Sequence, residues 1–154
     1  MAFHIVLVEP EIPANTGNIS RTCAATGTWL HLVRPLGFDT DDKTLKRAGL
    51  DYWHAVHIEY HDSFQEVKEQ YPDARFFFAT TKADKLYTDY SFQDGDFLVF
   101  GKETKGLPPE ILEQHPDTLM RMPMTDVVRS LNLSNSAAII LYEGLRQTGF
   151  QGLK

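Results

Sequence analysis

The chain has 154 residues, of which 42% are hydrophobic and 12% aromatic, and its 15 basic and 21 acidic residues give a net charge of −6. This length and composition suit one domain with its own core, spanning residues 1–154. No apolar run approaches the roughly 20 residues that span a bilayer, and the start of the chain lacks the features of a signal peptide, so we expect no membrane span and a cytoplasmic protein.

Hydrophobic periodicity and turn residues predict an alternation of strands and helices. In chain order we expect a strand at His4–Glu9, a helix at Thr16–Thr26, a strand at Leu30–Val33, a helix at Asp42–Leu50, a strand at Ala55–Glu59, a helix at Ser63–Tyr71, strands at Arg75–Thr80 and Phe97–Gly101, a helix at Pro109–His115, a strand at Leu119–Met122 and a helix at Asn132–Gln147. This order is typical of the α/β class, with a mostly parallel sheet covered by helices on both faces.

The turn before the last helix is the most informative segment. It is rich in small hydrogen-bonding residues, and either Ser130 or Asn132 is a natural N-cap for the helix. A helix N-terminus leaves backbone N–H groups unsatisfied and has partial positive charge, so this turn can bind a carboxylate, a phosphate or the edge of a nucleobase. A capped helix without a ligand explains this segment alone equally well.

Two other predicted strands also end in polar loops. The strand at His4–Glu9 leads into a loop with Asn15 and Gly17, and the strand at Phe97–Gly101 leads into the segment from Gly101 to Pro108. Because open α/β sheets bind ligands at the carboxyl ends of their strands, three such loops predict a binding site there.

Together the three segments resemble the SPOUT class of RNA methyltransferases, in its 2′-O-ribose branch. The residues that match the three motifs of that branch are Asn15, Gly17 and Arg21, then Gly101, Glu103 and Gly106, then Met122-Pro123 with Ser130-Leu131-Asn132. Outside the motifs, three segments are similar to the small tRNA (cytidine/uridine-34)-2′-O-methyltransferases of the TrmL type: Asp41–Lys43, Arg47–Tyr52 and Tyr142–Glu143. The resemblance covers nearly the whole chain.

The resemblance implies an S-adenosylmethionine-dependent enzyme that methylates the ribose 2′-hydroxyl of the wobble nucleotide, C34 or U34, in leucine tRNAs. It also implies a homodimer packed through its first and last helices, and a trefoil knot near the C-terminus. The implied cofactor pocket comprises Ala79, Thr80, Gly101, Gly106, Met122, Ser130 and Leu131.

The resemblance further implies a catalytic role for Arg21, supported by Glu103 and Asn132, with Asn15 and Arg129 facing the RNA. Related enzymes are described as using this arginine as a base. A guanidinium remains protonated in nearly every protein, so stabilisation of a developing alkoxide, or a grip on the adjacent phosphate, is physically easier.

The net negative charge argues against tight RNA binding by the surface as a whole, because phosphate neutralisation drives much of such affinity. Local basic groups can still serve, and they are Arg34, Lys43, Lys46 and Arg47, with Lys102, Lys105, Arg121 and Arg129 on or near the motif loops. Two alternatives remain: a catalytically silent RNA- or nucleotide-binding module, and a methyltransferase for another RNA or a small nucleoside. The complete third motif and Arg21 favour the enzyme.

Two other residue types invite a functional interpretation. His54, His57 and His61 are close in sequence, but they fall in or beside a predicted strand with no cysteine or paired carboxylate, so we expect no metal site. Cys23 is the single cysteine, beside Ala24 and Ala25 in a predicted helix, and we interpret it as a small core residue.

Overall fold

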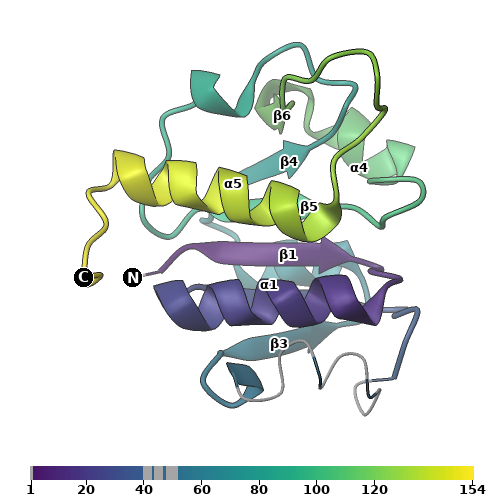
Figure 1. Cartoon of the computed structure of the whole chain (residues 1–154). Coiled ribbons are helices and arrows are strands. Elements are labelled where there is room, and N and C mark those ends of the chain that lie inside the picture. Colours follow the sequence, from purple (N-terminus) through teal and green to yellow (C-terminus); the bar gives the residue numbers. More distant parts are fainter. Residues whose placement is uncertain (1, 40–42, 44–46, 48–51) are drawn as a thin grey trace.

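Six short strands form one sheet in which every hydrogen-bonded pair of strands is parallel (Figure 1). The structure is a computed structural model that describes residues 2–39, 43, 47 and 52–154. The strand order is β3-β2-β1-β5-β4-β6, and the strands are β1 (His4–Val8), β2 (Trp29–Val33), β3 (Ile58–His61), β4 (Phe76–Ala79), β5 (Phe97–Phe100) and β6 (Leu119–Met120).

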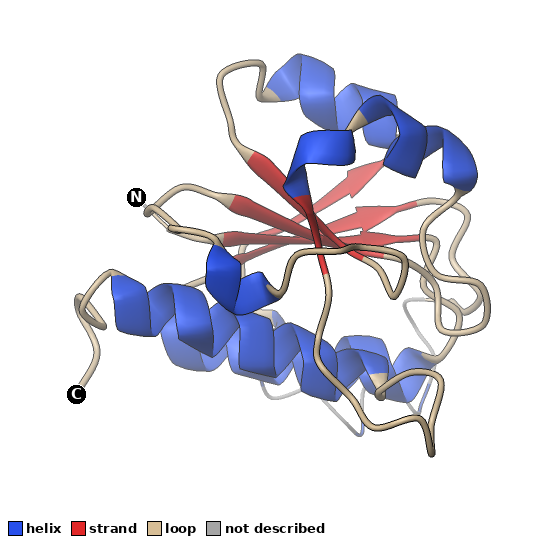
Figure 2. Cartoon of the chain, turned by 90° about the horizontal axis from the view of Figure 1, so that it is seen from above, coloured by secondary structure: helices blue, strands red, loops and turns tan. Residues whose placement is uncertain are grey.

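Helices cover both faces of this sheet, as Figure 2 shows. They are α1 (Pro13–Thr26), α3 (Phe64–Gln70), α4 (Pro109–Gln114) and α5 (Leu133–Gln147), with two short 3-10 turns, η1 (Tyr87–Asp89) and η2 (Pro116–Thr118). The α/β class predicted from the order of elements is therefore confirmed.

Alternation along the strands divides the core into two layers. Ile5 and Leu7 of β1 pack in the cluster that includes Ile19 of α1 and Ile140 of α5. Val6 and Val8 point to the opposite face, into the cluster formed with α3 and α4. Because β1 is buried on both sides, it is apolar at nearly every position, as central parallel strands are.

Several boundaries differ from the predicted ones. β1 ends at Val8 because Glu9 adopts a positive φ of 56°, outside the strand region. α1 begins at Pro13, whose ring suits the first turn of a helix.

The third strand lies later in the chain than predicted. Ala55 belongs to a turn in which its N–H donates to the carbonyl of Tyr52, so pairing with β2 begins only at Ile58. Of the predicted helix over 42–50, only residues 43 and 47 are described, so this helix stays a prediction, as does the trefoil knot. No helix in the described ranges has the length and apolar character needed to cross a membrane.

Cys23 is a core residue, as predicted. Its side chain is in the cluster between α1 and the sheet and is 1% exposed. Burial raises the pKa of the Cys23 thiol, which disfavours the reactive thiolate.

We therefore expect Cys23 in the folded protein to react far more slowly with a water-soluble disulfide reagent than it does in denaturant. The release of the coloured leaving group measures both rates, and Cys23→Ser supplies the background. Reaction at the unfolded rate under native conditions would contradict this burial.

Candidate active site

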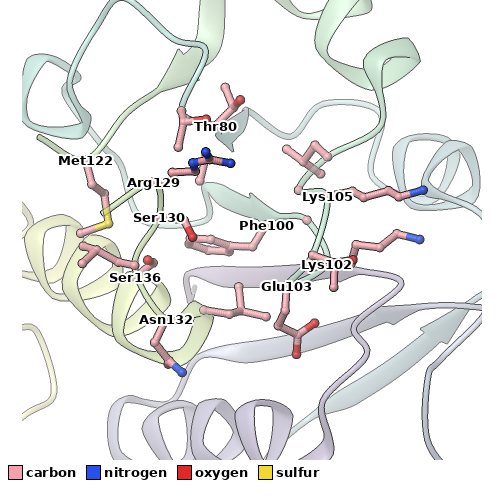
Figure 3. A pocket seen from close by; sticks show the side chains of 18 of the residues that line it. Thr80, Phe100, Lys102, Glu103, Lys105, Met122, Arg129, Ser130, Asn132 and Ser136 are labelled. Atoms are coloured by element: carbon pink, nitrogen blue, oxygen red, sulfur yellow. The ribbon is translucent and has the colours of Figure 1, made fainter. Parts of the chain in front are cut away.

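The carboxyl ends of the strands open into a pocket of about 480 Å³, within the usual size range of small-ligand sites. Most of its wall comes from three regions: the segment after β4, the loop after β5, and the chain between β6 and α5 (Figure 3). All seven residues predicted to contact a cofactor line it, namely Ala79, Thr80, Gly101, Gly106, Met122, Ser130 and Leu131. The pocket wall also contains Asn15, Glu103, Arg129 and Asn132.

The loop after β5 folds back on itself tightly. A Cβ on Gly101 would overlap the backbone of Gly106 and Leu107, so no larger residue fits where the strand ends. Gly106 has a φ of 69°, which favours glycine, and its N–H donates to the carbonyl of Lys102 at 2.9 Å. The family resemblance placed both glycines in the cofactor pocket, and the structure shows that Gly101 is required first by closure of its own loop.

The carboxylate of Glu103 joins this loop to the start of α1. One oxygen accepts from the N–H of Glu11 at 2.8 Å, and the other accepts from the N–H of Ile12 at 2.9 Å and from the side-chain amide of Asn15 at 3.1 Å. The two backbone donors belong to the N-cap Ile12 and to Glu11 just before it, where N–H groups have no partners within the helix. In this structure Glu103 therefore positions backbone rather than pointing a free carboxylate into the pocket.

A second carboxylate, that of Glu11, makes the converse contact from the segment before α1 to the loop after β5. Glu11 Oε1 accepts from the N–H and the hydroxyl of Thr104, at 3.1 and 2.7 Å. These hydrogen bonds from Thr104 lower the pKa of the Glu11 carboxyl. The two loops are thus clamped by reciprocal hydrogen bonds.

Asn132 connects the same network to α5. Its Oδ1 caps the helix by accepting from the N–H groups of Ser134 and Asn135, so Asn132 rather than Ser130 is the N-cap. Its Nδ2 donates to Oδ1 of Asn15 at 3.1 Å. All three predicted motifs therefore meet in one chain of hydrogen bonds, Glu103 to Asn15 to Asn132.

Basic side chains gather around the pocket although the protein is acidic. Lys82, Lys102, Lys105 and Arg129 all line it, and Lys102 lies 3.5 Å from Glu9. In Figure 3 the guanidinium of Arg129 lies near Thr80, while Glu103 points away toward α1. The pocket mouth is therefore suited to an anionic ligand.

Arg21 stands apart from this pocket. It is exposed on α1 and its guanidinium carbon lies 5.0 Å from the centre of the Tyr52 ring, and neither residue lines the pocket. It follows Asn15 by six residues, which is about 9 Å along a helix. Within one chain, the structure does not bring Arg21 together with the other predicted site residues.

Sequence reasoning missed several lining residues, including Lys82, Phe100 and Ser136. Ser136 had a usable signal, because it follows the N-cap Asn132 by four residues and so lies on the same side of the helix. Phe100 looked like an ordinary strand residue, and Lys82 follows β4 in a turn that no motif marks.

The fold and the pocket together define an α/β domain that binds its ligand at the carboxyl ends of parallel strands. A family model described as the SpoU rRNA methylase family matches residues 2–142. The chain belongs to this family, which confirms the class predicted from the three motifs.

Individual proteins are similar to this chain over nearly its whole length. A Bacillus subtilis protein with the provisional name tRNA (cytidine(34)-2′-O)-methyltransferase is 57% identical over 157 residues, which cover 100% of this chain and 98% of that protein. A solved structure described as giving insight into 2-OH methylation of C/U34 on tRNA is 44% identical with a TM-score of 0.91, covering 96% of this chain and 97% of that one. An AdoMet-bound rRNA methyltransferase from Sinorhizobium meliloti is 25% identical with a TM-score of 0.84, covering 94% of this chain and 56% of its own.

Replacing Glu103 tests the clamp. In Glu103→Gln one acceptor oxygen is replaced by an NH₂ group that faces backbone N–H donors, and leaving such donors unpaired costs about 1–3 kcal/mol. We expect urea denaturation to show a loss of this size, whereas Glu113→Gln on the exposed side of α4 should change little. Equal stability of the Glu103 variant and the wild type would show that the clamp does not hold the loops.

Proposed function

We propose that this protein is an S-adenosylmethionine-dependent methyltransferase that modifies the ribose 2′-hydroxyl of nucleotide 34, C34 or U34, in tRNA. The observation that carries the proposal is the convergence of three motif loops on one pocket, joined through Glu103, Asn15 and Asn132. The names of full-length relatives support the tRNA nucleotide and the reaction. Such a substrate is found in the cytoplasm, and leucine tRNAs are the expected set.

The residues of the pocket fit the proposed cofactor. Met122 and Leu131 offer apolar side chains to an adenine ring, and Thr80 and Ser130 offer hydroxyls to polar groups. The nearby lysines suit its carboxylate. The bound cofactor would supply a methyl group on a sulfonium, which is already a good leaving group, so the protein has chiefly to align the acceptor oxygen and stabilise its charge.

Arg21 is the proposed catalytic residue. Its guanidinium would stabilise negative charge on the 2′-oxygen as the hydroxyl loses its proton, or hold the adjacent phosphate. Arg129 would contact the RNA, whereas Asn15 is 6% exposed and hydrogen-bonded to Glu103 and Asn132, so its expected RNA contact gives way to a positioning role. The side chains of Glu103 and Asn132 are already hydrogen-bonded to Asn15 and to backbone groups. We therefore assign both residues a positioning role.

A homodimer would solve the separation of Arg21 from the pocket. α1 and α5 pack side by side on one face of the sheet (Figure 1), and α5 exposes Ile139 and Tyr142. If two copies pack through these helices, Arg21 of one copy can serve the pocket of the other. The basic groups of both copies would then line one RNA path on an acidic protein.

The direct test of the function is incubation with labelled S-adenosylmethionine and bulk tRNA lacking the modification, followed by nucleoside analysis. Label in 2′-O-methylcytidine or 2′-O-methyluridine at position 34 is expected. Binding of tRNA and cofactor with no transfer to any RNA would favour the silent binding module. Label on another RNA would keep the chemistry and change the substrate.

Cofactor binding should need no metal ion. By calorimetry in excess chelator, we expect wild type to bind S-adenosylmethionine and Gly101→Val to lose at least about tenfold in affinity, because the loop after β5 must open to admit the side chain. Ala55→Val, which adds two carbons rather than three and does so in an exposed turn, is the control. No binding by wild type under chelation would overturn the claim.

Arg21→Ala should retain cofactor affinity and lose most methyl transfer. Arg75→Ala is the control for loss of an exposed arginine far from the pocket. Arg75 also stacks on a ring, with its guanidinium carbon 5.1 Å from the centre of Phe77, but it precedes β4 at the opposite end of the strands. Because Arg75 also pairs with Asp96 at 3.3 Å, the control is compared with wild type at a temperature where both are folded. Transfer at the normal rate by Arg21→Ala would show that the catalytic assignment is wrong.

Mixing folded Arg21→Ala and Gly101→Val subunits tests the shared site in the same assay. Random reassociation makes about half of the dimers mixed, with one intact site in each, so roughly a quarter of wild-type activity should return. No recovery with mixed dimers demonstrated would mean that Arg21 serves its own chain.

A further inference from the structure

A second polar cluster lies on the opposite face of the sheet from α1 and α5. His31 is completely buried in β2, His61 is 3% exposed at the end of β3, and Glu59 is two residues before His61. None of the three lines the pocket. The reaction proposed above does not use these groups.

Strand pairing brings the three side chains together. The register of β2 and β3 places His31 directly opposite Glu59, and alternation puts His61 on the same face as Glu59. In the sequence, His61 is close only to His54 and His57, and we expected no metal site there. The structure instead groups His61 with the carboxylate of Glu59 and with His31, which lies 30 residues away along the chain.

The donor atoms have the spacing of ligands around a metal ion. His31 Nδ1 is 3.0 Å from His61 Nε2 and 3.5 Å from Glu59 Oε1, and His61 Nε2 is 3.8 Å from the same oxygen. Four ligands placed tetrahedrally about Zn²⁺ at about 2.0–2.1 Å are roughly 3.3–3.4 Å from one another. We propose that His31, Glu59 and His61 bind one Zn²⁺ ion, with water as the fourth ligand.

Groups around the cluster would orient its ligands. His31 Nε2 is 2.8 Å from His4 Nδ1, Glu59 Oε2 is 2.7 Å from His57 Nε2, and the Tyr71 hydroxyl donates to Glu59 Oε1 at 2.8 Å. Ligands in metal sites are commonly held by such outer hydrogen bonds. The amide of Gln70 also donates to Glu59 Oε1, at 3.2 Å, and would have to yield its place to the ion.

Tautomers decide which ring nitrogens can bind the ion. His31 Nε2 is 2.8 Å from His4 Nδ1, so a proton on His31 Nε2 leaves His31 Nδ1 as an acceptor. The hydrogen bond between His31 Nδ1 and His61 Nε2 then places the His61 proton on Nε2. This proton would move to Nδ1 of the same ring when the ion binds, and both facing nitrogens would then be ligands.

The site has a route to solvent. The side chain of Glu59 is 21% exposed and that of His57 is 46% exposed, and β3 is the edge strand of the sheet. An ion at this position would tie the edge strand to β2. Its role would be structural, because it lies outside the pocket where the cofactor is proposed to bind.

The test uses the full-length protein without a histidine tag, stripped of metal and titrated with Zn²⁺ against a chromophoric chelator. We expect one tight site per chain and a rise in Tm with Zn²⁺. Co²⁺ in its place should give the visible absorption of a tetrahedral site. Glu59→Gln and His61→Asn should each weaken Zn²⁺ binding by at least about tenfold, a loss at the lower end of what even outer-shell partners cause.

His54→Gln is the control, because it removes an exposed histidine and leaves the three ligands in place. Glu59→Gln removes a partly exposed carboxylate, so it gives a folded variant even if His61→Asn does not fold. The proposal is overturned if wild type has no tight site, if Glu59→Gln binds as well as wild type, or if His54→Gln abolishes binding. The methyltransferase assay is independent of all these outcomes.

Discussion

The pocket depends on one carboxylate, that of Glu103, which accepts from two backbone N–H groups just before α1 and from Asn15. An anion is favoured at this place because the first turn of a helix has unpaired donors and partial positive charge. Through Asn15 the same interaction reaches Asn132 and the first turn of α5. One charged group therefore holds together loops that leave β1 and β5 and the helix that follows β6.

The parallel sheet brings the remaining segments of the pocket wall together. Parallel strands end at one edge, so the segments after β4, β5 and β6 open onto a common space. The net charge of −6 and the basic pocket wall are compatible, because Lys82, Lys102, Lys105 and Arg129 are concentrated there while acidic residues are spread over the rest of the chain. Charge placement rather than total charge decides which surface an RNA can approach.

The sequence predicted the order and type of the described strands and helices, because hydrophobic periodicity is local and strong in buried strands such as β1. It also named most of the motif residues that line the pocket. It could not show that Glu103 contacts Glu11, 92 residues away, or that His31 faces Glu59, because these contacts follow from strand order and register. The start of β3 was wrong because Ala55 and Val56 are apolar but lie in a turn.

The row of His4, His31 and His61 crosses three neighbouring strands, with each ring nitrogen contact at 3.0 Å or less. A slip of one residue in β2 would turn His31 to the other face of the sheet, among the apolar side chains of α1 and α5, and would leave the rings of His4 and His61 without partners. Leucine or valine at these positions could tolerate such a slip at smaller cost. The three histidines therefore raise the free-energy cost of a shifted register in β2 above the cost that a row of apolar residues would give.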